Sequence, residues 1–211
     1  MSHPSVSARP RPVRRAVRTR VVALVLLAAL LLATISTFAV AQSTNCSNLV
    51  ADGGFESGSG WQSATNGSYT LLSDFNARSG AKAAQLAGVD GASDQLSIPL
   101  ALPADKPSVS LSFWWQVQSE EHSGEFDGLS VIAADAAGNP MHSLLTLGSD
   151  STATQWQQSV VDLSAYSGQA IQLKFVAQTD NSLVTDFFID DVAVTACGAA
   201  AYQVFLPVTQ R

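Results

Sequence analysis

The sequence lacks the short motifs that identify common hydrolase active sites. His-Glu-x-x-His and Gly-x-Ser-x-Gly are both absent. Of the three histidines, His3 lies near the N-terminus, and His122 and His142 have no motif around them. The acidic segment 120–127 offers carboxylates to a glycosidase or to a second cation, but a segment this polar is typical of a solvated loop. We therefore expect no catalytic residues and no enzymatic activity.

Basic residues are scarce beyond the N-terminal segment. The first twenty residues hold six of the 11 basic residues and no acid. Residues 42–211 keep the other five together with all 17 acidic residues, which leaves them a net charge near −12. Phosphate contacts need a basic face, so this balance argues against nucleic acid as a partner. It favours a divalent cation or a neutral ligand such as a glycan.

The N-terminal segment reads as an export signal. The arginines are followed by the uncharged run 21–38 and then by Ala-Val-Ala at 39–41, a small-x-small cleavage signature. A signal peptide usually has an apolar run of about 7–15 residues, whereas a bilayer span takes roughly 17–25, so an uncleaved membrane anchor stays open as the alternative. We predict a helical signal segment at residues 1–41 and a secreted or cell-surface protein, with membrane contact only if the segment stays attached.

Cysteine is also scarce, because Cys46 and Cys197 are the only two in the chain. They bracket nearly everything with the pattern of a folded domain. In an oxidising compartment two such cysteines are expected to pair, which brings their Cα atoms within about 7 Å. Closing so long a loop would stabilise the fold by up to roughly 5 kcal/mol. The alternative is a pair of free thiols.

Helical periodicity is nearly absent between the cysteines, and alternation of apolar and polar residues replaces it. Residues 108–118 and 170–178 both alternate with a period of two, which predicts strands with one face on a core. Further strands are expected at 68–73, 82–88, 94–102, 126–134, 141–147, 156–163 and 187–195. Short strands without crossover helices predict an all-β, two-sheet antiparallel sandwich. We assign it residues 42–197, with a C-terminal tail at 198–211.

Three segments resemble a known group of domains. "NLVADGGFESGSGW" at 48–61 and "ARSGAKAAQL" at 77–86 are similar to the opening of galactose-binding-like jelly-roll modules. Residues 156–194 resemble the closing half of MAM-like domains of secreted bacterial proteins and of family 4/9 carbohydrate-binding modules. The resemblance implies a jelly-roll fold and a secreted, non-catalytic module for a carbohydrate or cell-surface ligand. The alternative is a structural or adhesive surface protein with no small-molecule ligand.

The same resemblance implies a structural calcium ion that joins the first and last strands. Glu56 and Asp190 would supply side-chain oxygens, and backbone carbonyls near Gly54 and Lys82 would complete the site. Calcium takes six to eight oxygen ligands, so this mixture is chemically suitable. If Asp190 instead accepts backbone N–H groups or meets Lys82, no cation is needed.

The alternation of side chains along residues 187–195 also predicts the direction of the Asp190 side chain. Strict alternation places Asp190 on the same face as Phe188 and Val192, so we expect its side chain to point toward the core and that of Asp191 to point away. A buried carboxylate must be paired or bound to a metal. This expectation agrees with the calcium prediction.

Aromatic side chains are the candidates for sugar binding. Trp114 lies on the polar face of its strand beside Gln116, and Trp61 lies in a Gly/Ser-rich loop. We predict Trp114, Gln116 and Trp61 as ligand-binding residues. The alternative for Trp114 is packing under a loop, and the two are distinguished by whether that strand face is open.

Overall fold

Antiparallel strands make up nearly all of the regular structure. The computed structural model describes residues 42–43, 45–122, 126–153, 155–198 and 201–202. The expected signal helix at 1–41 and most of the expected tail lie outside this set. Within it, the one helical segment is a 3₁₀ turn, η1 (Ser164–Tyr166). No helix among these residues has the length and apolar character to cross a bilayer.

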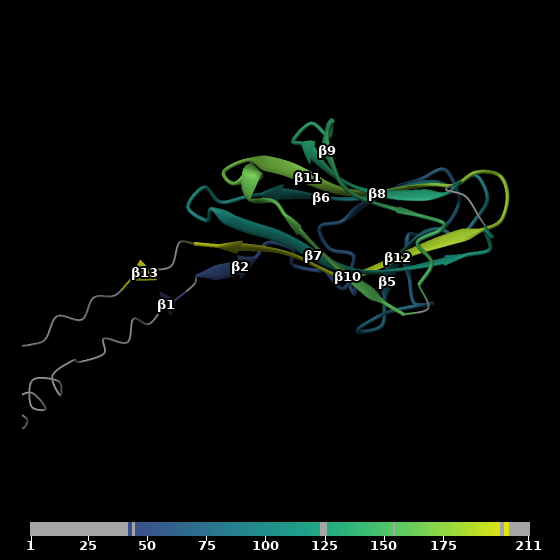
Figure 1. The fold of residues 1–211 in the computed structure, drawn as a ribbon, viewed down its shortest axis with the longest axis horizontal. Coiled ribbons are helices and arrows are strands. Elements are labelled where there is room, and N and C mark those ends of the chain that lie inside the picture. The colour runs from purple at the N-terminus through teal and green to yellow at the C-terminus, as the bar shows by residue number, and fades with distance from the viewer. Residues whose placement is uncertain (1–41, 44, 123–125, 154, 199–200, 203–211) are drawn as a thin grey trace, which may run out of the picture. The chain divides into compact units, whose positions relative to one another are not determined.

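A six-stranded sheet forms one layer of the fold (Figure 1). Its strands run in the order β10-β7-β12-β5-β4, and β2 also pairs with β12. The bounds are β2 (Cys46–Asn48), β4 (Leu72–Ser73), β5 (Ala83–Ala87), β7 (Ser108–Ser119), β10 (Gln157–Asp162) and β12 (Thr185–Cys197). Strand β12 is central, because it pairs with β7, β5 and β2.

A five-stranded sheet forms the second layer, in the order β3-β6-β11-β8-β9 (Figure 1). The bounds are β3 (Gln62–Thr65), β6 (Ser93–Ala101), β8 (Gly128–Asp135), β9 (Pro140–Gly148) and β11 (Ala170–Gln178). A separate two-stranded sheet consists of β1 (Gln42–Ser43) and β13 (Ala201–Tyr202). The fold is therefore the predicted all-β antiparallel sandwich of jelly-roll type.

The core lies between the two large sheets. Leu111 and Phe113 of β7, and Leu173 and Phe175 of β11, are fully buried, as the alternation of both segments predicts. The rings of Phe113 and Phe175 meet edge to face with their centroids 5.4 Å apart. Burying each of these side chains contributes about 1.5–3 kcal/mol to folding.

The predicted disulfide is confirmed. Cys46 in β2 stands opposite Cys197 in β12, and their sulfur atoms are bonded with the Cα atoms 4.0 Å apart. The bond therefore joins the first strand of the six-stranded sheet to the end of its central strand.

One expected strand was wrong. In the segment 68–73 only Leu72–Ser73 is a strand, because the hydroxyl of Tyr69 donates to the Asp94 carboxylate, 2.8 Å from Oδ1, and holds this part as a loop. Strand β3 at Gln62–Thr65 was not expected, because its residues show no apolar alternation. It is an edge strand whose register is set by β6.

A bulge in β12 changes which side chains face the core. Asp190 pairs with Trp114, but the next pair is Ala193 with Ser112, so two residues of β12 stand opposite one residue of β7. Asp191 absorbs the bulge with φ at 48°, a left-handed conformation that Asp tolerates better than most residues.

Because of the bulge, the prediction that Asp190 points toward the core is wrong. Before it, Phe187 and Ile189 belong to the core, and after it Val192 belongs to the core. Asp190 therefore lies with Phe188 on the outer face of the six-stranded sheet. It is nevertheless fully buried, so other residues must cover it there.

The disulfide yields a prediction. The purified protein should take up no alkylating reagent before reduction and two equivalents after it, because its two cysteines are bonded to each other. Replacing both by serine should lower the free energy of unfolding by about 2–5 kcal/mol, measured by chemical denaturation. Two reactive thiols in the unreduced protein would contradict the bond.

Candidate functional site

The first candidate region is the cover over Asp190 on the outer face of the six-stranded sheet. Asp190 Oδ2 accepts hydrogen bonds from the backbone amides of Arg78 (2.8 Å) and Ser79 (3.0 Å). Its Oδ1 accepts one from the backbone amide of Asp191 (2.7 Å). Burial raises the pKa of Asp190, while the hydrogen bonds from these backbone amides lower it. Three N–H donors compensate for burying the carboxylate, and together they fix residues 78–79 to β12.

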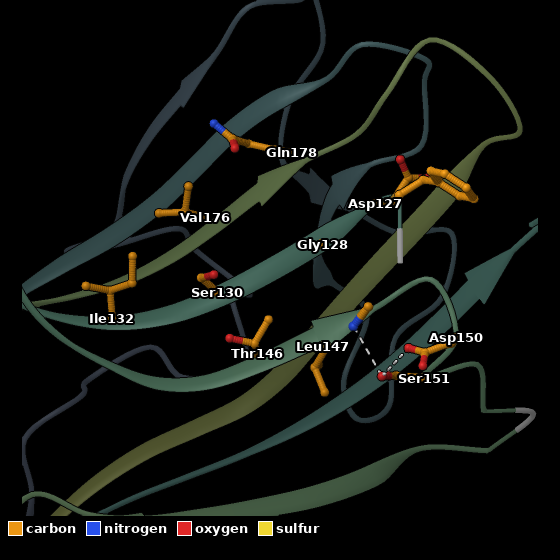
Figure 2. Close-up of a pocket in the computed structure, with 12 residues that line it drawn as sticks. Asp127, Gly128, Ser130, Ile132, Thr146, Leu147, Asp150, Ser151, Val176 and Gln178 are labelled. Atoms are coloured by element: carbon orange, nitrogen blue, oxygen red, sulfur yellow. Dashed lines mark hydrogen bonds between the residues drawn. The ribbon is translucent and has the colours of Figure 1, made fainter. Parts of the chain in front are cut away.

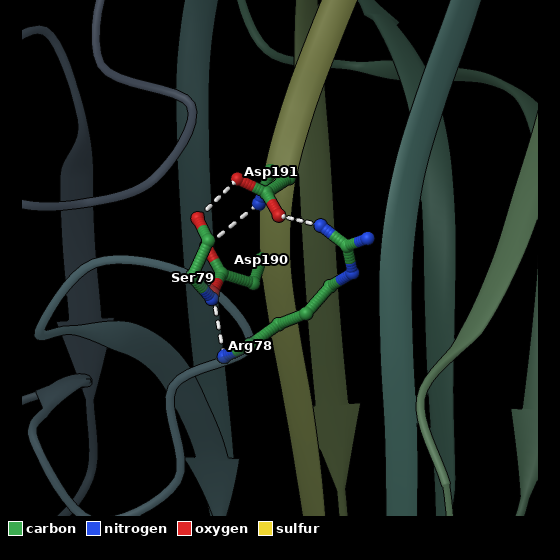
Figure 3. Close-up of polar contacts among 4 residues, drawn as sticks. All are labelled: Arg78, Ser79, Asp190 and Asp191. Atoms are coloured by element: carbon green, nitrogen blue, oxygen red, sulfur yellow. Dashed lines mark hydrogen bonds and ion pairs between the residues drawn. The ribbon is translucent and has the colours of Figure 1, made fainter.

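The neighbouring Asp191 strengthens the same cover (Figure 3). Its carboxylate forms an ion pair with Arg78 and accepts a hydrogen bond from the Ser79 hydroxyl at 2.7 Å. The Arg78 guanidinium lies over the Trp114 ring, 3.7 Å from its centroid. One face of Trp114 is therefore already stacked on a protein group.

The other two predicted ligand-binding residues are also engaged within the protein. Gln116 is buried, its Oε1 accepts a hydrogen bond from Asn76 and its Nε2 donates to the Ala153 carbonyl. The Trp61 indole donates to a backbone carbonyl and its ring packs against Phe55 and the core. Trp114 and Gln116 lie together under residues 76–79, and Trp61 lies apart from them. Their role in binding stays a prediction, but the geometry is that of packing under a loop.

The predicted calcium ligands lie around this cover. Glu56 Oε1 accepts hydrogen bonds from the backbone amides of Ala81 (2.8 Å) and Lys82 (3.1 Å), and Lys82 Nζ donates to the Glu56 carbonyl at 3.2 Å. A side chain at Gly54 would begin 3.9 Å from Asp190 Oδ1. Glu56 thus contacts Lys82, and Gly54 lies near Asp190. Carboxylate and carbonyl oxygens are of the kind that calcium binds. Calcium binding stays a prediction, and Asp190 accepts the backbone N–H groups that make a cation unnecessary for its charge.

The second candidate region is a hollow on the outward face of the five-stranded sheet. It has a volume of about 700 Å³ and lies over β8, β9 and β11 (Figure 2); we call it the β8–β9 hollow. Gly128 stands between Gln178 of β11 and Gly148 of β9. A β-carbon at Gly128 would find only the Leu147 carbonyl nearby, at 3.7 Å. The hollow is open here because Gly128 and Gly148, which pair across adjacent strands, have no side chains to fill it.

Polar and aromatic groups surround this opening. Ser130 stands between Val176 and Thr146 in the next row of the sheet. Gln178 is exposed at one side, and Phe126, at 59% exposure, is at the mouth. An exposed aromatic ring beside amide and hydroxyl groups is suited to a ligand with one apolar face and several hydrogen-bonding groups.

Sequence reasoning did not find this hollow. The signal was present, because a glycine inside a strand often marks a place where a ligand approaches closely. Gly128 and Gly148 become one feature only through the register of β8 against β9. Phe126 follows an acidic cluster and gives no periodic signal of its own.

Asp127 of the hollow and the nearby Glu121 each have one buried carboxylate oxygen without a hydrogen-bond partner among the described residues. Asp127 is 2% exposed, and its Oδ1 accepts a hydrogen bond from the Asp180 amide at 2.8 Å. Its Oδ2 is buried without a hydrogen-bond partner among the described residues, and so is Glu121 Oε1. Burial raises the pKa of Glu121, and the nearby charges of Asp180 and Asp127 raise it further.

Comparison with known proteins places these features in a family context. The model of the MAM domain (meprin/A5/mu) matches residues 55–198. The carbohydrate-binding module TmCBM61, solved in complex with β-1,4-galactotriose, is 19% identical with a TM-score of 0.54, over 70% of this chain and 97% of that chain. The K3 cleaved adhesin domain of Lys-gingipain from Porphyromonas gingivalis is 18% identical with a TM-score of 0.52, over 74% and 99%. No curated protein sequence matches the chain.

The cover over Asp190 yields a prediction. In the presence of a chelator, Asp190→Ala should lower the free energy of unfolding by about 3 kcal/mol or more, because three part-buried backbone amides lose a charged acceptor. The matched variant Asp191→Asn should cost about 1 kcal/mol or less, because Asn keeps an oxygen for the Ser79 hydroxyl and tolerates the left-handed backbone, and the ion pair that it loses with Arg78 is partly exposed. Urea denaturation of both variants measures the difference, and equal losses would be incompatible with this account.

Proposed function

The chain belongs to the MAM domain family, whose model matches most of the folded part, and from this premise we propose that it is a secreted, non-catalytic module that binds carbohydrate. The β8–β9 hollow is the observation that carries the proposal. Its volume of about 700 Å³ lies within the roughly 300–1,000 Å³ of typical small-ligand sites.

The lining of the hollow suits a sugar ring. The apolar face of a pyranose can stack on Phe126, while its hydroxyl groups reach Gln178, Thr146 and Ser130. The same jelly-roll fold carries β-1,4-galactotriose in the complex of TmCBM61. That likeness supports a glycan as the ligand class by analogy of fold alone, and the argument rests on the hollow itself.

The charge of the hollow narrows the class of glycan. Asp127 and Asp150 line it, and none of its lining residues is basic. An acidic glycan would therefore meet like charge from these two residues, with no basic side chain among the described lining residues to compensate it. A neutral glycan fits the lining best.

The disulfide supports a location outside the reducing cytoplasm, because such bonds persist in oxidising compartments. We propose a secreted or cell-surface protein. Its N-terminal basic and apolar segments support export.

Glycan binding is tested by filling the hollow. On a glycan array, the wild-type protein should bind neutral oligosaccharides and not acidic ones. Gly128→Val should abolish binding without a loss of melting temperature, because its new side chain would occupy open space in a strand. Phe126→Ala should weaken binding about tenfold, which corresponds to the loss of one stacking contact.

Trp114→Ala is the discriminating variant. If the β8–β9 hollow is the site, Trp114→Ala keeps its binding, because Trp114 lies under Arg78 on the other sheet. If binding is lost in Trp114→Ala and kept in Gly128→Val, the site is on the six-stranded sheet and the proposal for the hollow is wrong.

An adhesive role without a small ligand is the second candidate. Phe75 is 73% exposed and stacks on Phe188, so the cover over Asp190 presents an aromatic ring to solvent. An exposed ring of this kind suits contact with another protein surface. The absence of binding to any glycan on the array would favour this role.

We also propose calcium as a structural cofactor held by Glu56 and Asp190, with carbonyl groups near Gly54 and Lys82. Calcium should raise the melting temperature, and chelation should lower it. Glu56→Gln should remove most of this response, since it keeps the acceptor for the amides of Ala81 and Lys82 but lacks the charge. Asp191→Asn is the control and should retain the response. An identical melting curve for wild type with calcium and with chelator would refute the proposal.

A further inference from the structure

Three acidic residues meet at one end of the sandwich. Glu121 follows the end of β7, Asp127 precedes β8, and Asp180 lies between β11 and β12. They are close enough for the charges of Asp127 and Asp180 to act on Glu121. A hydrogen bond from the Asp180 amide to Asp127 Oδ1 ties two of these segments together.

The unusual feature is that two oxygens of this group are both buried and unpaired. Asp127 Oδ2 and Glu121 Oε1 have no hydrogen-bond donor within the described ranges. No lysine or arginine compensates for them there, because the one salt bridge among these residues joins Arg78 to Asp191. Among the charges that act on Glu121, that of His122 is the one of opposite sign, and its Nδ1 is engaged with the Glu120 carbonyl at 2.8 Å. Asp190, by contrast, has three amide donors.

A buried carboxylate oxygen without a donor is costly, and it is costlier still beside other negative charges. Folded proteins keep such groups where a proton or a cation completes them. We propose that a divalent cation binds between Glu121 and Asp127 and contacts the two unpaired oxygens. This site is separate from the one predicted at Glu56 and Asp190.

The chemistry of the donors indicates the kind of cation and its affinity. Carboxylate oxygens are the ligands of calcium, whose flexible coordination accepts neutral oxygens and water in the remaining positions. No three acidic, histidine or cysteine side chains are gathered into a ready-made metal group in the parts of the chain that the structure describes. With two charged ligands, the dissociation constant should be about 10⁻⁴–10⁻³ M, the range of extracellular calcium modules.

The position of Asp127 gives the cation a consequence for the β8–β9 hollow. Asp127 lies between Phe126 and Gly128, and all three line the hollow. A cation on Asp127 would fix this edge of the hollow and place Phe126 for stacking. Only this consequence rests on the proposed glycan site.

The test uses the full chain carrying Glu56→Gln, so that the other predicted calcium site does not contribute. In calorimetric titration with calcium chloride this parent should show one weak site. Calcium at ten times the dissociation constant should raise its melting temperature by about 3–6 °C. Adding Asp127→Asn or Glu121→Gln should remove both the heat of binding and this rise.

The chelated proteins distinguish the proposal from a loss of folding. With no cation, Asp127→Asn should melt at the same temperature as the parent or higher, because it removes one of two facing charges and keeps the acceptor for the Asp180 amide. Asp150→Asn, an acidic residue of the same hollow outside this pair, is the matched control and should keep the calcium response. The proposal is overturned if the parent shows no response at 10-fold above 1 mM calcium, on the order of the weakest affinity expected, or if Asp127→Asn responds as the parent does. Glycan binding enters none of these readouts, so they stand or fall independently of it.

Discussion

The shape of the six-stranded sheet depends on how β12 accommodates Asp190. This strand holds the sheet together, because β7, β5 and β2 all pair with it. A strictly regular β12 would have to put a carboxylate into the apolar core or expose Val192 and Val194. The bulge at Asp191 avoids both outcomes, because it moves the alternation by one residue within the strand. The carboxylate then accepts hydrogen bonds from three backbone amides, two in the segment that covers it and one in its own strand.

This solution makes the two outer faces of the sandwich different. Residues 76–79 are fixed over Trp114 and Gln116 by the bonds to Asp190 and Asp191, so this part of the six-stranded sheet is covered. The five-stranded sheet has its hollow on the opposite layer, over β8, β9 and β11. Gln116 on one sheet therefore serves internal packing, while Ser130, Thr146 and Gln178 on the other line an open hollow.

The sequence predicts the parts of this fold that depend on local alternation. The core faces of β7 and β11 follow from a period of two, and the disulfide follows from two cysteines at the ends of one domain. Alternation fails at Asp190, because one inserted residue reverses the faces and adjacent Asp residues give no warning of it. It fails again at Tyr69, whose bond to Asp94 joins residues far apart in the sequence. The hollow could not be predicted, because Gly128 and Gly148 are separated in the chain and meet only through strand register.

Two of the buried aspartates, Asp190 and Asp127, show how the same residue type serves different ends. Both are almost inaccessible to solvent. Asp190 accepts hydrogen bonds from three backbone amides, so its charge fixes the backbone around it. One oxygen of Asp127 accepts a hydrogen bond from the Asp180 amide, and the other has no donor among the described residues. The charge of the neighbouring Glu121 is also negative. Backbone amides alone can compensate a buried carboxylate in this fold, as they do at Asp190, but Asp127 receives only one such hydrogen bond. The unpaired Asp127 Oδ2 at the edge of the hollow, which has no donor among the residues that the structure describes, is the reason to expect a cation from solution there.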